Sequence, residues 1–141
     1  MLTWNTDFAK GLVGLLGNDK AIGEVFHITS DEVLTWNQIF LEVYQALDLE
    51  PNVIHISSEM IVRHDPEKLG TLLGDKVNSV VFDNRKIKRF VPEFSCEVNW
   101  AQGLRRSLDW FESHPKFQTI DKEMNARWDN LISRYDNVFP Q

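Results

Sequence analysis

GDKVNSVVFDNRKIKRFVPEF, residues Gly74–Phe94, is the stretch that decides the predicted fold of this chain. The apolar run Val80–Phe82 predicts a short buried strand, and Asp83-Asn84 predicts a turn after it. A short helix with one apolar and one basic face is expected next, and Pro92 ends it. The apolar face is formed by Ile87, Phe90 and Val91. The basic face is formed by Arg85, Lys86, Lys88 and Arg89.

A βαβ unit is predicted upstream of this stretch. Val25–Thr29 and Val53–Ile56 are apolar runs typical of strands. Between them, Thr35 and Gln38 match a capping box that begins a helix. This order predicts parallel strands with a right-handed crossover, so the expected fold class is α/β, with a small parallel sheet of about three strands that includes Val80–Phe82 and packs with several helices. The core-facing residues of the intervening helix are expected to be Trp36, Ile39, Phe40, Val43 and Leu47.

Other helices are predicted from capping residues and apolar spacing. A helix over residues 7–16, capped by Asn5 or Thr6, is expected to be closed by Gly17. Ser57 caps a short helix through Arg63, and Pro66 begins another. Gly70–Lys76 is expected to be a loop. Two longer helices follow, one from Asn99 to His114 and one from about residue 119 to Tyr135. The inward positions of the first helix are predicted to be Phe8, Leu12, Leu15 and Leu16.

Composition sets broad limits on the function. The 141 residues fall in the size range of one domain, so residues 1–141 are expected to form a single substrate-binding-type domain. The net charge of −6 argues against a broad surface for nucleic acid. The single cysteine, Cys96, has no internal disulfide partner, and no Cys/His cluster has metal-ligand spacing. No early apolar run is long enough to span a bilayer, and a cytoplasmic location is expected.

Three motifs together resemble the late part of the NAD-dependent epimerase/dehydratase family, the extended short-chain dehydrogenase/reductases. They are LTWNTDFAKGLVGLLG (Leu2–Gly17), FHITSDEVLTWNQIF (Phe26–Phe40) and the GDK of Gly74–Lys76 followed by VVFDNRKIKR. In that family a small C-terminal lobe binds the substrate. The resemblance implies that this chain is such a lobe, whose role is to close over a small polar substrate held against the nicotinamide of NAD or NADP in the full-length parent.

The chain lacks the chemistry of the family's other half. Its seven glycines never form a G-x-G-x-x-G turn, and the spacing of Gly11, Gly14 and Gly17 predicts close helix packing instead. The family's Tyr-x-x-x-Lys pair is also missing, since Tyr44 and Tyr135 are not followed by lysine four residues later. No catalytic, cofactor or metal residue is therefore assigned, and the chain alone is not expected to be an enzyme. Two explanations remain, a fragment of a longer two-lobed enzyme, which is favoured, and a stand-alone remnant with another role.

The resemblance also points to substrate-binding residues. Nucleotide-sugar members offer an arginine for the diphosphate two residues before the Gly-Asp pair, and here that position is Leu72. The charge must then come from Lys76, Lys68 or Arg63, while Asp75 can accept from a substrate hydroxyl. The competing interpretation of Asp75 and Lys76 is a solvated Gly-Asp turn. The substrate class stays open, with a nucleotide-sugar-like ligand one candidate.

Two alternatives come from other functional classes. The basic run Arg85–Arg89 can bind RNA or another anionic ligand in a non-catalytic module, although such a run is more often the solvated face of a helix. The chain can also be a structural fragment that forms a homodimer through exposed apolar surface. The expected partners are thus a small polar substrate and the nucleotide-binding half, with a possible homodimer, no membrane, and nucleic acid disfavoured.

Overall fold

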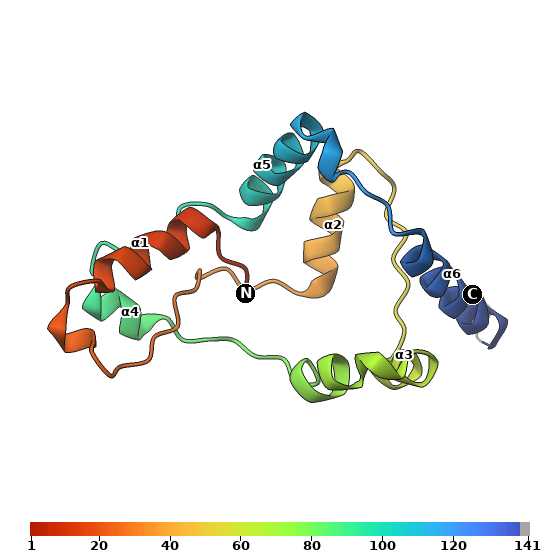
Figure 1. The fold of residues 1–141 in the computed structure, drawn as a ribbon, viewed down its shortest axis with the longest axis horizontal. Helices are drawn as coiled ribbons and strands as arrows, with labels where there is room; N and C mark the ends of the chain where they lie inside the picture. Colours follow the sequence, from red (N-terminus) through yellow and green to blue (C-terminus); the bar gives the residue numbers. More distant parts are fainter. Residues whose placement is uncertain (139–141) are drawn as a thin grey trace. The chain divides into compact units, whose positions relative to one another are not determined.

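A computed structural model describes residues 1–138, and within them the regular elements are helices (Figure 1). The α-helices are α1 (Asn5–Leu15), α2 (Trp36–Ala46), α3 (Ser58–His64), α4 (Arg85–Phe90), α5 (Trp100–Ser113) and α6 (Lys122–Val138). Single turns of 3₁₀ helix occur at Asp19–Ala21, Pro66–Lys68 and Pro115–Phe117, and Gly70–Asp75 is π-helical.

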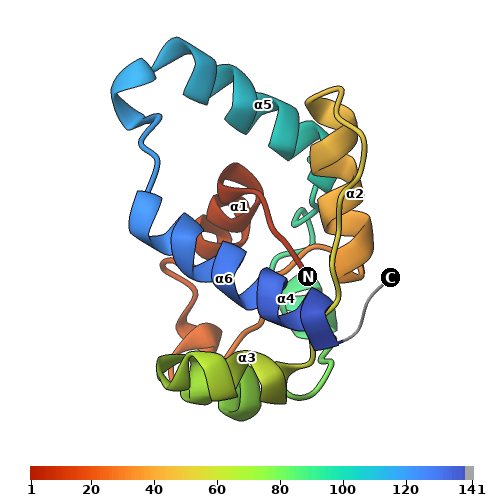
Figure 2. The same cartoon turned by 90° about the vertical axis from the view of Figure 1, so that its right-hand side faces the viewer.

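The chain divides into two compact units. The first contains Met1–Pro51 and Val81–His114, and the second contains Asn52–Val80 and the described residues from Pro115 onward. In the first unit α1 contacts α4 and α2 contacts α5 (Figure 1). Figure 2 shows α2 and α5 side by side from a second direction.

The predicted α/β fold is wrong, because residues 1–138 contain no strand. The three segments expected to form the parallel sheet have no ladder partner, and several of their apolar side chains are exposed, as at Val25 (77%) and Val81 (62%). A strand forms only where a neighbouring segment pairs with its backbone N–H and C=O groups. The apolar pattern of a segment does not show whether such a neighbour is present. Next to Thr29, side chains satisfy these groups instead. The Ser30 amide donates to Thr3 Oγ1 (3.0 Å), and the Thr29 carbonyl accepts from Asn84 (2.9 Å).

The core of the first unit is built on α4. Ile87, Val91 and Phe94 are buried there, so the predicted apolar face of this helix is confirmed. Partly buried apolar side chains surround them, namely Leu15, Phe26, Ile28, Phe90 and Cys96.

Helix α1 packs on this core through glycines and Leu15, and not through the other three residues predicted to face inward. A Cβ on Gly14 would lie 2.3 Å from Val91 Cγ1, and one on Gly11 would lie 2.6 Å from Ile28 Cγ2, so the expectation of close packing is confirmed for these two glycines. It is wrong for Gly17, which has open space around it. Phe8, Leu12 and Leu16 are exposed instead. The N-cap is Trp4, without a side-chain hydrogen bond, and neither Asn5 nor Thr6 has that role. Apolar spacing mispredicted the buried side of α1, because the helix backbone approaches the core most closely at glycines, where no side chain intervenes.

The local signals of α2 and α5 are confirmed. Thr35 and Gln38 form the predicted capping box of α2, and Asn99 forms one with Gln102 at the start of α5. The Trp100 indole also donates to the Ile39 carbonyl (3.2 Å). The predicted burial of α2 is only partly met, because none of its residues is buried, and the most exposed members of its expected core face are Trp36, Phe40 and Leu47.

In the second unit, Ser57 caps α3 by accepting from the Met60 amide (3.2 Å), as predicted. The 3₁₀ turn that begins at Pro66 is capped by Asp65. Gly70–Asp75 is helical, so the predicted loop is wrong at these residues. On α6, Leu131 is buried, with 2% of its surface exposed. None of the helices described in residues 1–138 has both the length and the apolar character needed to cross a bilayer.

Candidate functional site

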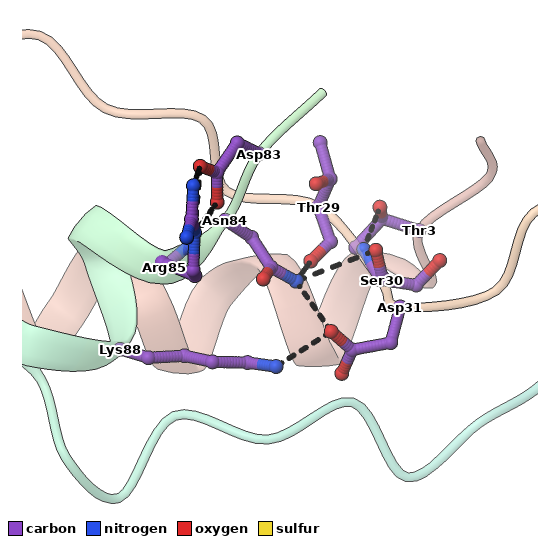
Figure 3. Close-up of polar contacts among 8 residues, drawn as sticks. All are labelled: Thr3, Thr29, Ser30, Asp31, Asp83, Asn84, Arg85 and Lys88. Carbon is purple, nitrogen blue, oxygen red and sulfur yellow. Dashed lines mark hydrogen bonds and ion pairs between the residues drawn. The ribbon is translucent and has the colours of Figure 1, made fainter. Parts of the chain in front are cut away.

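A polar cluster surrounds Asn84, which is 7% exposed (Figure 3). Its side-chain amide donates to the carbonyls of Thr29 (2.9 Å) and Ser30 (3.4 Å) and to the Asp31 carboxylate (2.9 Å). Ser30 in turn donates through its hydroxyl to the Leu2 carbonyl (2.7 Å). The cluster thus joins the start of the chain, the segment before α2 and the N-terminus of α4. The cluster has a structural role, because its polar groups hydrogen-bond to one another and to the backbone of these three segments.

Carboxylates beside α4 neutralise much of its positive charge. Asp83 accepts from the Arg85 amide (2.8 Å), as expected for the predicted Asx turn, and its pairing with the Arg85 guanidinium (2.6 Å) lowers the Asp83 pKa to about 2. The Lys88 ammonium and then the Asn84 amide lower the pKa of Asp31. Both carboxylates are therefore charged at neutral pH.

A groove of about 820 Å³ lies along the basic face of α4. Its lining contains Val25, His27, Asp83 and the four basic side chains. Arg85 pairs with Asp83 (2.6 Å), Lys86 with Glu24 (2.5 Å) and Lys88 with Asp31 (2.5 Å). Within residues 1–138, only Arg89 of these four has no ion pair. The groove consequently offers a polyanion much less charge than the sequence suggests.

A second pocket, of about 860 Å³, lies within the second unit and is here called the α3/α6 pocket. Its volume is within the range of roughly 300–1,000 Å³ common for small-molecule sites. Residues on and before α3 contribute His55, Ser57, Glu59, Met60, Arg63 and His64. Residues of α6 contribute Leu131, Arg134, Tyr135 and Val138.

Two guanidinium groups give the α3/α6 pocket its chemical character. Neither Arg63 nor Arg134 forms an ion pair with a carboxylate of the described residues. Glu59 is the one acidic side chain in the lining, so the two arginines leave a positive balance. Guanidinium groups bind phosphate and carboxylate through paired hydrogen bonds, and the Tyr135 ring adds a flat apolar surface. This combination suits an anionic ligand with a ring.

The predicted substrate-binding residues lie in different places. Arg63 lines the α3/α6 pocket. Lys68 lies half-buried at the end of the 3₁₀ turn and is not part of the pocket lining. Asp75 and Lys76 also lie outside it, at the end of the π-helical segment, where they pair with each other (3.0 Å) and are well exposed. The structure thus brings one of the four predicted residues into the pocket, and a substrate role for the other three stays a prediction.

Arg134 was missed by sequence reasoning. It lies in a helix correctly predicted from its apolar residues, but the partner of that helix is far away in the sequence. The available signal was its position three residues after Leu131 and next to Tyr135, which places it beside the inward face of α6. Spacing alone could not show that α3 lines the same pocket.

The described residues do not fit a dinucleotide cofactor. Gly11 and Gly14 are occupied by packing of α1, and Gly17 and Gly23 have positive φ values in open turns. No glycine-rich turn of the described residues presents backbone amides at a helix N-terminus in the manner that a pyrophosphate requires. Residues 1–138 also contain no group of three or more His, Cys, Asp or Glu placed to hold a metal ion.

Comparison with known proteins gives one distant similarity. The UDP-N-acetyl-alpha-D-glucosaminuronate decarboxylase of Bacillus cytotoxicus is 21% identical over 109 residues, which is 77% of this chain and 31% of that protein. This chain therefore spans about a third of the length of the curated relative it matches. The similarity agrees loosely, at the level of enzyme type, with the resemblance to the NAD-dependent epimerase/dehydratase family. No family model matches the chain, and no solved structure does.

Proposed function

We propose that this chain is the C-terminal substrate-binding part of an NAD-dependent epimerase/dehydratase-like oxidoreductase, and that the α3/α6 pocket binds an anionic, nucleotide-sugar-like substrate. The observation that carries the proposal is the Arg63 guanidinium, which faces a pocket of suitable volume without a carboxylate partner in the described residues. The distant relative is named for a UDP-sugar acid, which supports this ligand class.

In this proposal the chain binds and orients the substrate, and it does not carry out the reaction. Arg63 holds an anionic group of the substrate by paired hydrogen bonds, and the pocket wall excludes water from one side of the ligand. NAD would supply the hydride chemistry, and its binding is assigned to parts of the enzyme beyond this segment, because the residues described here do not fit it. Asp75, Lys76 and Lys68 are proposed to contact the substrate outside the pocket.

The test is calorimetric titration of the chain with UDP-N-acetyl-alpha-D-glucosaminuronate. We expect saturable binding, and Arg63→Gln should weaken it by about tenfold or more, equivalent to about 1.4 kcal/mol. Arg127→Gln is the matched control, because it removes the same charge from α6 outside the pocket lining. Absence of saturable binding, or equal binding by Arg63→Gln, would rule the proposal out. Micromolar binding of NAD by the chain would contradict the division of labour.

A further inference from the structure

The α3/α6 pocket contains a second arginine that the proposed function does not use. Arg134 lies on α6, and Arg63 lies at the end of α3, so the two guanidinium groups come from two different helices that line one pocket. This inference rests on the proposed function and deepens it, because it concerns what the same pocket can distinguish.

The two arginines differ from several other cations of the chain in having no acidic partner. Arg127, on the same helix as Arg134, pairs with Glu123 (2.8 Å), and Arg85 pairs with Asp83. Arg63 and Arg134 form no ion pair with the described residues. Two uncompensated charges on a concave surface raise the local positive potential and attract anions.

Packing of α6 directs Arg134 toward the pocket. Leu131 is 2% exposed and also lines the pocket. Residues three apart on a helix lie on the same side, so the burial of Leu131 fixes the side on which Arg134 lies. Tyr135, four residues after Leu131, shares that side and the lining. The helix therefore places Arg134 in the pocket lining, where its side chain is exposed.

We infer that Arg134 is a specificity-determining residue, which makes the pocket select a diphosphate over a monophosphate. Arg63 alone can hold one phosphate group through its paired N–H donors. In this inference the second guanidinium, from α6, engages the ligand only if the ligand carries a second phosphate group. Selection then requires both guanidinium groups, so removal of Arg134 reduces the preference for a diphosphate and leaves the Arg63 contact in place.

The experiment uses inorganic pyrophosphate, inorganic phosphate, UDP and UMP as probes, followed by amide chemical shifts in NMR titrations at constant ionic strength. Wild type should bind pyrophosphate at least about tenfold more tightly than phosphate, with shifts in α3 and α6. Arg134→Gln should reduce this ratio to about threefold or less, and Arg127→Gln should leave it unchanged. Far-UV circular dichroism and the thermal midpoint verify that both variants fold as wild type does.

The outcomes separate this inference from the proposed function. Retention of the pyrophosphate preference in Arg134→Gln, or no preference in wild type, overturns the role of Arg134. If UDP and the UDP-sugar still bind through Arg63 in that case, the proposed function stands. If the preference depends on Arg134 but UDP binds no more tightly than pyrophosphate, the inference stands and the nucleotide-sugar assignment falls.

Discussion

The side-chain amide of Asn84 donates a hydrogen bond to the main-chain carbonyl of Thr29, 2.9 Å away and 55 residues earlier in the chain (Figure 3). The same amide reaches the Ser30 carbonyl and the Asp31 carboxylate. One nearly buried donor group thereby fixes a segment that has no strand partner. This arrangement makes the first unit sensitive to the chemistry of a single side chain.

Replacing Asn84 by aspartate should strongly destabilise the chain. The new carboxylate would face two carbonyls and Asp31, so a donor becomes an unpaired buried charge. We expect a loss of roughly 2–4 kcal/mol in the free energy of unfolding, measured by urea denaturation at pH 7. Asn78→Asp makes the same change at an exposed position and should have little effect. Equal stability of the two variants would contradict a structural role for Asn84.

Gly14→Ala should destabilise the chain although alanine favours helices. The added methyl would lie 2.3 Å from Val91 Cγ1, and overpacking of this kind costs roughly 1–3 kcal/mol, against a propensity gain of about 1 kcal/mol. Thermal unfolding of Gly14→Ala, Val91→Ala and the double variant tests this. The double variant should be more stable than the sum of the single effects predicts. Gly70→Ala, with open space around it, is the control. Additive effects would show that α1 is not packed against Val91.

Asp7 should make stability depend on acidic pH. Its carboxylate is 1% exposed, and burial by itself would raise the pKa, but hydrogen bonds from the Val98 amide, the Lys10 ammonium and the Glu97 amide outweigh burial and lower it. Because the folded pKa lies below the unfolded value of about 3.9, the stabilisation is present above that pH and is lost as pH falls through the folded pKa.

The measurement for Asp7 is urea unfolding at several pH values between neutral and strongly acidic. Asp7→Asn should lower the free energy of unfolding at pH 7 by roughly 1–3 kcal/mol and flatten its decline below about pH 4. Asp109→Asn, at an exposed position of α5, is the control. A decline with the same steepness in Asp7→Asn and wild type would assign the acid sensitivity to other carboxylates.

Single-stranded RNA should bind this chain weakly, with a shallow dependence on salt. Only Arg89 among the four basic residues of the α4 groove lacks an ion pair with the described residues, so the logarithmic salt slope should be near about −0.7, and not the roughly −2.8 of four free cations. Filter binding over a salt series measures it. Glu24→Gln releases Lys86 and should steepen the slope. A slope near about −2.8 in wild type, as expected for four free cations, would instead support RNA binding as a function.

Helix ends could be predicted from the sequence because their signals are local. The hydroxyl of Thr35, the side-chain Oδ1 of Asn99 and the hydroxyl of Ser57 each accept from a backbone N–H only three residues later. Such contacts depend on neighbouring residues and little else, so their positions survive in any tertiary arrangement. The apolar face of α4 was predictable for the same reason.

Which side of each helix is buried could not be predicted with the same success. In α1 the buried side carries Asp7 and Gly11, while Phe8 and Leu12 are exposed. Apolar spacing assumes that the largest side chains face the core, but here close backbone approach and a hydrogen-bonded carboxylate determine the contact. The candidate site was predictable to a similar extent, since Arg63 was identified and Arg134 was not.

The sequence by itself determined where α2, α3 and α5 begin, and which segments are apolar, because capping and the 3.6-residue period act over a few neighbouring residues. Only the tertiary structure decided that Val25–Thr29 pairs with no strand, that Asn84 satisfies its last carbonyl, and that α3 and α6 share one pocket. These features depend on segments distant in the chain, whose meeting is governed by the packing of the whole fold and not by local preference.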